Sequence, residues 1–154
     1  MQKKIKVLYN TGNLNEFYAK GALNAFKIEL KPHESIIIGE SLITNDNERT
    51  RFYIEGNVPI LREKFILREL EANTPSKRVY FIVQQMYLAK EPTQLQKLYL
   101  EYVRDLQNAA PSLIPYIAAV SDCVLNNDFY AAIKNADKLV KKESELFGEA
   151  LNLG

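Results

Sequence analysis

The chain has 154 residues, 47% of them hydrophobic, and a net charge of +1 at neutral pH. These values are typical of one globular domain or of two small lobes that share a core, and they lack the strongly basic balance of many nucleic-acid-binding domains. The single cysteine, Cys123, excludes an internal disulfide framework and favours a reducing cytoplasm. No apolar run approaches the roughly 20 residues of a membrane span.

Charge is unevenly placed along the chain. The first 80 residues carry 13 Lys and Arg against 10 Asp and Glu, and the remainder carries 7 against 9. The first half is therefore the more suited to a polyanionic partner.

Residues 1–25 are interpreted as a flexible extension, because disorder concentrates at chain ends. Within this segment Lys4 to Tyr9 could form a short strand, and Phe17 to Phe26 one or two helical turns. Gly21 argues against that helix.

Residues 26–70 predict a small β lobe. Short runs of β-branched and alternating residues are separated by turns at Pro32-His33, Gly39 and Gly56-Asn57. Pro59 favours an edge position for the last strand. Glu63 to Leu70 is left open between a strand end and a short helix. The predicted strands are Phe26–Leu30, Ser35–Ile38, Ser41–Thr44, Thr50–Ile54 and Val58–Leu61.

Residues 74–150 predict a lobe of about four helices packed on the β lobe. Thr74 and Pro75 are the favoured cap and first residue of a helix. Apolar residues then recur at helical spacing. The predicted fold class is thus α+β, a small antiparallel barrel or sandwich of about five strands followed by a helical bundle. The apolar set of the first helix is Val79, Ile82, Val83 and Met86.

Two later helices are predicted from the same helical spacing of apolar residues. The third is predicted to bury Ile114, Ile117, Ala118, Ser121, Val124 and Leu125, and the fourth Phe129, Ile133, Ala136, Val140 and Phe147. Gly148 is a candidate stop for the fourth helix. Tyr99, Tyr102 and Tyr130 occupy core-like positions.

Catalytic residues, metal ligands and cofactor motifs are not recognisable. The single histidine, His33, lies in a predicted turn, and a lone histidine without nearby cysteines makes no metal cluster. Adjacent strand residues point to opposite faces, so His33, Glu34 and Ser35 do not assemble a triad locally. Glu143 and Glu145 are interpreted as ordinary solvated charges. We therefore expect that the protein is not an enzyme and that it binds no cofactor.

Arginine and lysine side chains are the candidate functional groups. Each could form surface ion pairs of little energetic value or bind phosphate, for which the planar arginine fork is suited. Phe52 and Tyr53 are adjacent, so if one faces inward the other faces outward beside the arginines. The outward ring could stack on an RNA base, or each ring could belong to its own packing layer. The candidate RNA-binding residues are Arg49, Arg51, Arg62, Lys64, Lys77 and Arg78.

Four motifs follow one another in the order LKPHE, IIIGE, VPILRE and EANTPSKRVYFIVQQMYL, and the region they mark spans roughly Phe26 to Phe147. In this order they resemble the FlbT family of flagellin regulators. The most specific piece runs from Thr74-Pro75 through Arg78, Tyr80, Phe81 and Gln84. The sequence departs from the family pattern at His33, where the family usually has Gly.

This resemblance implies a cytoplasmic, non-enzymatic regulator. Family members bind the 5′ untranslated region of flagellin mRNA and control its decay or translation, often beside a small helical partner, FlaF. A shorter stretch, from Glu34 to Ile66, resembles carbon storage regulators, in which an arginine near the last strand contacts mRNA; Arg62 is the matching residue. A homo-oligomer is left open.

The alternative is a protein-interaction module that binds flagellin or a FlaF-like partner and affects mRNA indirectly. Its basis is the nearly all-apolar stretch from Val79 to Leu88 together with the near-neutral net charge.

Overall fold

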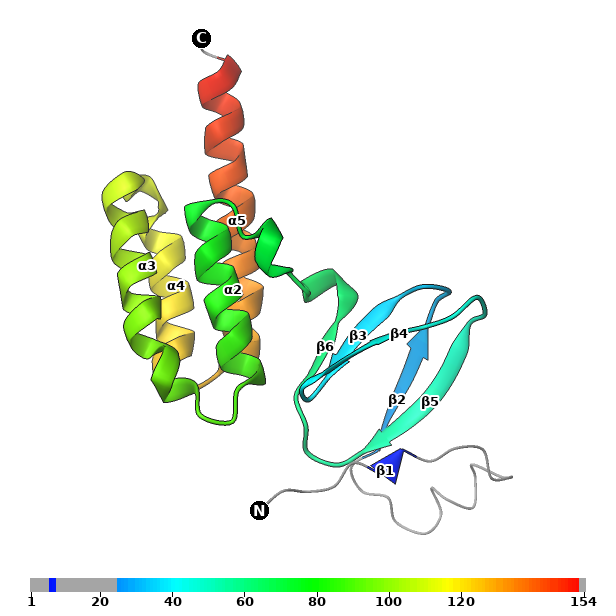
Figure 1. Ribbon diagram of the computed structural model, residues 1–154. Coiled ribbons are helices and arrows are strands. Elements are labelled where there is room, and N and C mark those ends of the chain that lie inside the picture. Colours follow the sequence, from blue (N-terminus) through cyan, green and yellow to red (C-terminus); the bar gives the residue numbers. More distant parts are fainter. Residues whose placement is uncertain (1–5, 8–24, 153–154) are drawn as a thin grey trace. The chain divides into compact units, whose positions relative to one another are not determined.

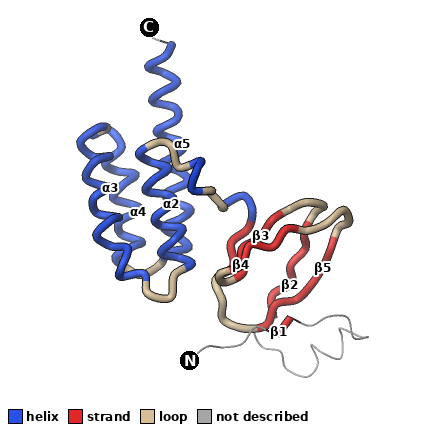
Figure 2. Tube along the Cα trace, in the orientation of Figure 1, coloured by secondary structure: helices blue, strands red, loops and turns tan. Residues whose placement is uncertain are grey.

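The computed structural model describes residues 6–7 and 25–152 and divides into two compact units, residues 1–64 and 65–154. All described β-strands belong to the first unit and all described α-helices to the second (Figures 1 and 2). The predicted α+β class is confirmed.

The β unit contains two antiparallel sheets of three strands each, in the orders β1-β5-β2 and β4-β3-β6. No strand pairing among the described residues closes them into a barrel, so the barrel or sandwich form stays a prediction. The last strand lies at a sheet edge, as Pro59 indicated, but is displaced by one to two residues. The strands are β1 Lys6–Val7, β2 Ala25–Leu30, β3 Ser35–Ile38, β4 Ser41–Thr44, β5 Thr50–Glu55 and β6 Ile60–Arg62.

The N-terminal predictions fall mostly outside the described residues. Lys6 and Val7 do form a strand, which pairs with Glu55 and Ile54 of β5. The helix predicted to end at Phe26 is wrong at that end, because Ala25 and Phe26 belong to β2. Residues 8–24 are not described.

One hydrophobic cluster joins strands of both sheets. Alternation along β2 and β5 turns every second side chain to this cluster, as expected for half-buried strands. The opposite faces of these strands carry polar side chains, and candidate cations such as Arg51 lie there. The cluster comprises Ile28, Leu30, Ile36, Ile38 and Ile54, with Phe52, Val58 and Ile60 packed against it.

Two turns of this unit use the left-handed backbone region. Gly39, between β3 and β4, has φ +62°, and His33, between β2 and β3, has φ 62°. Glycine adopts this conformation without cost, whereas a side chain crowds the backbone. The turn predicted at His33 is confirmed, and its φ accounts for the glycine that the FlbT pattern usually has there.

The helical unit contains four α-helices and short 3₁₀ turns in the described chain. Thr74 caps the first helix as predicted, and its hydroxyl accepts the Lys77 N–H (3.2 Å). The region left open at Glu63 to Leu70 forms 3₁₀ turns, η1 Glu63–Phe65 and η2 beginning at Glu69. The other elements are α2 Pro75–Leu88, η3 Pro92–Leu95, α3 Gln96–Ala109, η4 Pro111–Leu113, α4 Ile114–Leu125 and α5 Phe129–Asn152.

Burial confirms the predicted face of α2 but corrects those of α4 and α5. The α2 set Val79, Ile82, Val83 and Met86 is buried in full. In α4 most side chains are small or apolar, so periodicity does not select one face. Ile117 and Val124 are buried as predicted, but Ile114, Ala118 and Leu125 are exposed.

The predicted stop at Gly148 is wrong, because α5 continues to Asn152. A glycine commonly ends a helix by adopting a left-handed backbone, and Gly148 does not adopt one. Ile133 and Ala136 are buried as predicted, but Phe147 is 53% exposed. Of the core-like tyrosines, Tyr99 is buried, whereas Tyr130 is 40% exposed. Figure 1 shows α5 continuing past the ends of the neighbouring helices.

The first turn of α2 has an acceptor for each of its free N–H groups. Pro75 has no N–H, Lys77 donates to Thr74, and the Ser76 N–H donates to Glu143 Oε2 of α5 (2.9 Å). Glu143 is only 4% exposed. The interpretation of Glu143 as a solvated charge is therefore wrong, because it stabilises the positive end of a neighbouring helix.

Two further polar side chains of α2 hold the segment that precedes it. The Gln84 amide accepts the Leu67 N–H (2.8 Å) and donates to the Leu67 carbonyl (3.0 Å). The Tyr80 hydroxyl donates to the Phe65 carbonyl (2.6 Å). Burial raises the pKa of Tyr80, with Asp137 adding to the effect. These bonds satisfy a segment that has no strand or helix partner of its own.

We predict that Glu143→Ala lowers the free energy of unfolding by about 2–3 kcal/mol, because it leaves the buried Ser76 N–H without its charged acceptor. The matched control is Glu145→Ala, which removes an exposed pair with Lys142 (3.1 Å) and should cost less than about 0.5 kcal/mol. Urea unfolding followed by helical circular dichroism measures both. Equal effects of the two substitutions would contradict the capping role.

We also predict that His33→Gly raises the free energy of unfolding by about 0.5–1 kcal/mol. The gain from relieving the left-handed backbone exceeds the added entropy of glycine in the unfolded chain. Gly39→Ala places a side chain in the same backbone region and should lower stability. Thermal unfolding of the two variants gives opposite shifts; a destabilised His33→Gly variant would show that the imidazole is needed at the turn.

Candidate nucleic-acid interface

Glu29 of β2 lies where the candidate arginines of the β unit meet. It is paired directly with Arg51 across the β2–β5 ladder, and Arg49, the residue before β5, also contacts it. Arg51 Nε lies 3.2 Å from Glu29 Oε2, and Arg49 Nη1 forms an ion pair with Glu29 Oε1. Each carboxylate oxygen of Glu29 is thus engaged by a different arginine.

Arg62 reaches the same residue from the other sheet. It is the last residue of β6, and its Nη1 donates to the Glu29 backbone carbonyl (3.0 Å). The next turn is held by Glu63, whose Oε1 accepts the Ser35 N–H (3.0 Å). Arg62 therefore connects the β4-β3-β6 sheet with β2, and it places a half-buried guanidinium beside the Glu29 ion pairs.

These side chains line an open depression of about 460 Å³ in the β unit. Four of its lining residues are cationic and two are acidic, so its charge is net positive. At its rim the Lys31 N–H donates to Glu34 Oε2 (2.8 Å), which closes the turn that contains His33. The lining residues are Glu29, Lys31, Glu34, Arg49, Arg62 and Lys64.

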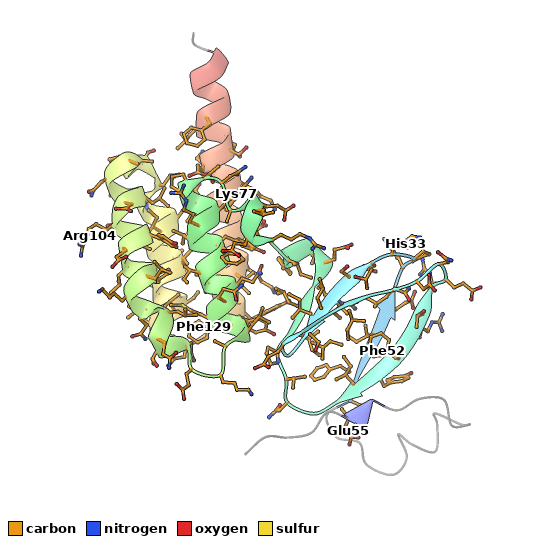
Figure 3. All side chains as sticks on the ribbon, in the orientation of Figure 1. His33, Phe52, Glu55, Lys77, Arg104 and Phe129 are labelled. Atoms are coloured by element: carbon orange, nitrogen blue, oxygen red, sulfur yellow. The ribbon has the colours of Figure 1, made fainter. Side chains whose placement is uncertain are left out.

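The structure brings together four of the six predicted RNA-binding residues. Arg49, Arg62 and Lys64 line the depression, and Arg51 is joined to it through Glu29. Lys77 and Arg78 belong to the helical unit, where Lys77 Nζ donates to Asn73 Oδ1 (3.3 Å). Figure 3 shows Lys77 on α2, among the helices.

Sequence reasoning missed Glu29, Lys31 and Glu34. Alternation along Lys27-Ile28-Glu29-Leu30-Lys31 indicates that Glu29 and Lys31 share the outer face of a strand. The shared face of Glu29 and Lys31 could therefore have been predicted from the sequence. The pairing of Glu29 with Arg51 could not, because it depends on the register between two strands that are distant in sequence.

The choice between Phe52 and Tyr53 is decided by the core. Phe52 packs against the hydrophobic cluster (Figure 3). Tyr53 lies on the face opposite to Phe52, which is the face of Arg51, and it pairs across the ladder with Lys27. The aromatic side chain that accompanies the arginines is therefore Tyr53.

Other chemistry is sparse in the described part of the chain. Residues 6–7 and 25–152 contain no group of three or more His, Cys, Asp or Glu placed to hold a metal ion. His33 is exposed at its turn, and its backbone N–H donates to the Asp46 carbonyl (3.1 Å). None of the described helices has the length and hydropathy needed to cross a bilayer.

The apolar stretch that suggested a protein partner is used inside the helical unit. Val79, Ile82, Val83 and Met86 are each at most 4% exposed, so they form the core of the bundle and not a docking surface. The protein partner itself stays a prediction.

Comparison with known proteins matches residues 26–147 to the model of the family described as "Flagellar protein FlbT". The chain belongs to the FlbT family. No solved structure matches it.

Named relatives agree with this assignment. The chain is 49% identical over 126 residues, 81% of this chain and 86% of the relative, to the "Probable flagellum biosynthesis repressor protein FlbT 1" of Bradyrhizobium diazoefficiens. It is 47% identical over 78% of its length to a Rhodopseudomonas palustris protein named as a probable repressor of the same kind, covering 95% of that relative. The "Flagellum biosynthesis repressor protein FlbT" of Caulobacter vibrioides is 28% identical over 79% of this chain and 89% of its own. These names describe regulators and not enzymes.

Membership of the FlbT family gives the strongest motif a structural meaning. Thr74 caps α2, while Tyr80 and Gln84 hold Phe65 and Leu67. The motif therefore specifies the start of the helical unit. The cationic depression is built from other residues of the family match.

We predict a carboxyl pKa for Glu29 below its ordinary value of 4.5. The hydrogen bond from Arg49 is the largest cause, and the charges of Arg49, Arg51 and Lys27 add to it. A carbon-detected NMR titration of the side-chain carboxyl should show this lowered midpoint in the wild type and a higher one in Arg49→Ala. Arg104→Ala, an exposed arginine of α3, is the matched control.

The lowered pKa of Glu29 determines how its contribution to the free energy of unfolding changes with pH. Because the folded state holds Glu29 ionised to lower pH, its stabilising contribution is complete above about pH 4.5 and is lost as the pH falls through the lowered value. An unshifted midpoint in the wild type would contradict the ion-pair geometry.

Proposed function

We propose that this FlbT-family protein is a cytoplasmic post-transcriptional regulator of flagellum biosynthesis that binds the 5′ untranslated region of flagellin mRNA. Binding would control the decay or translation of that message during flagellum assembly. The observation that carries the proposal is the gathering of Lys31, Arg49, Arg62 and Lys64 around one depression in the β unit.

Electrostatics support an RNA ligand for this surface. Arginines suit phosphate because their planar fork donates two parallel hydrogen bonds. Arg49 and Arg51 side chains are 58% and 64% exposed, so they keep donors for a ligand while they pair with Glu29. Ion pairing with Glu29 orients both guanidinium groups before a ligand arrives, which reduces the entropy lost on binding.

Base stacking would add to the phosphate contacts. Tyr53 lies on the same face as Arg51 and beside Lys27 across the ladder. RNA proteins commonly stack unpaired bases on aromatic side chains next to cations. A single-stranded part of the leader is therefore the expected target. The names of the relatives, which describe repressors of flagellum biosynthesis, support the choice of message.

We predict that the affinity of the purified protein for a purified flagellin leader RNA falls as salt rises, with a log–log slope of about −0.7 for each phosphate contact. Arg62→Ala and Lys64→Ala should each weaken binding and flatten this slope by about one contact. Fluorescence anisotropy at several salt concentrations measures both quantities without cell extract.

Variants in the helical unit are the controls for this measurement. Arg104→Ala removes an exposed arginine of α3 and should leave the affinity and slope unchanged. Lys77→Ala and Arg78→Ala should have smaller effects than Arg62→Ala, because those residues do not line the depression. A flat salt response, or equal losses in Arg104→Ala and Arg62→Ala, would contradict the proposed interface. Circular dichroism of every variant separates lost binding from lost folding.

A further inference from the structure

We infer that the depression lined by Glu29, Lys31, Glu34, Arg49, Arg62 and Lys64 binds one unpaired nucleotide and that Glu34 makes it selective for guanine. This inference rests on the proposed RNA-binding function and specifies its base preference.

The two carboxylates of the depression differ in what they have left to bind. Both oxygens of Glu29 are engaged by arginines. Glu34 uses only Oε2, which accepts the Lys31 backbone N–H (2.8 Å). Among the described residues none donates to its Oε1. Glu34 therefore keeps Oε1, and the second lone pair of Oε2, as acceptors that no described residue occupies.

A site for phosphate alone does not account for this carboxylate. A negative side chain at the rim repels a phosphate and would weaken such a site. The mixed lining fits a ligand that carries an anion and also hydrogen-bond donors. A nucleotide has both, with the phosphate for Arg49, Arg62 and Lys64 and the base edge for Glu34. The volume of about 460 Å³ lies in the roughly 300–1,000 Å³ range of small-ligand pockets.

Guanine complements this arrangement better than the other bases do. Its Watson–Crick edge presents two adjacent N–H donors, which a carboxylate can accept together, and its O6 and N7 are acceptors that a lysine or arginine can contact. Glu34 and Lys31 belong to the same hydrogen-bonded turn and supply both kinds of group. Uracil has one N–H between two carbonyl oxygens, and those oxygens repel a carboxylate.

The test uses RNAs of about ten nucleotides, which is within the site sizes of small single-strand-binding folds. Each is all uridine except for one central G, A, C or U. The full-length protein should bind the G-containing RNA roughly fivefold or more tightly than the all-uridine RNA, the lower end of discrimination by a two-bond base contact.

Glu34→Gln is the decisive variant. Its amide oxygen can still accept the Lys31 N–H, but the group no longer presents two acceptors, so the preference for G should fall below about twofold. Glu48→Gln makes the same charge change at an exposed residue outside the depression and should keep the preference. Circular dichroism checks that both variants fold. If Glu34→Gln does not fold, the binding of the four RNAs to the wild-type protein still decides whether the site prefers guanine.

Each result has one meaning. Equal binding of all four RNAs overturns the guanine site and leaves RNA binding in place. A preference that survives Glu34→Gln assigns the selectivity to other residues and overturns the role of Glu34. Absence of binding to all four RNAs and to the flagellin leader overturns the proposed function, and the guanine site with it.

Discussion

The fold of the helical unit depends on how the buried beginning of α2 satisfies its hydrogen bonds. Pro75 has no N–H to satisfy, Lys77 uses the Thr74 hydroxyl, and Ser76 uses the carboxylate of Glu143, 67 residues later in the chain. An uncapped N–H in this position would cost roughly 1–3 kcal/mol. Because the acceptor for Ser76 comes from α5, the first and last helices of the unit are fixed to one another by a polar contact as well as by packing.

Polar contacts of the same helix determine where the helical unit begins. Tyr80 and Gln84 bind the backbone of Phe65 and Leu67, so an irregular segment has partners inside the bundle. Alanine in place of either residue would leave partly buried backbone groups without these partners. The FlbT motif around Thr74 is thus explained by the physics of folding, and it gives no direct information about a ligand.

The candidate site lies in the β unit, where Glu29 contacts Arg49 and Arg51 from one segment of the chain and Arg62 from another. The carboxylate orients Arg49 and Arg51, and the backbone carbonyl fixes Arg62. Arg49 and Arg51 are largely exposed and Glu29 is partly exposed, so these ion pairs contribute little to stability at ordinary salt. Their effect is to hold positive charge in one place, which is a property suited to a polyanion.

Local patterns in the sequence predicted local features well. The strands Ser35–Ile38 and Ser41–Thr44, the cap at Thr74 and the buried face of α2 agree with the structure. The uniform apolar character of α4 left its buried face undetermined, so Ile114 and Leu125 were misplaced. Partners distant in sequence were out of reach: Glu143 looked like a surface charge, and the meeting of Glu29 with Arg51 and Arg62 requires the strand register.

The candidate site was accordingly predicted in part. Arg49, Arg51, Arg62 and Lys64 were identified as cations, and the structure groups them, whereas Lys77 and Arg78 were included because they are close in sequence to the others. The depression is formed within the β unit, and Lys77 and Arg78 belong to the helical unit, which the sequence spacing alone did not reveal.

The proposed RNA interface is tested most directly by an NMR chemical-shift map of the ¹⁵N-labelled protein during titration with flagellin leader RNA. We expect the largest shift changes at residues around the depression, including Lys31, Glu34, Arg49 and Arg62, and small changes in α3 and α4. Changes confined to the helical unit, or none at saturating RNA, would contradict it.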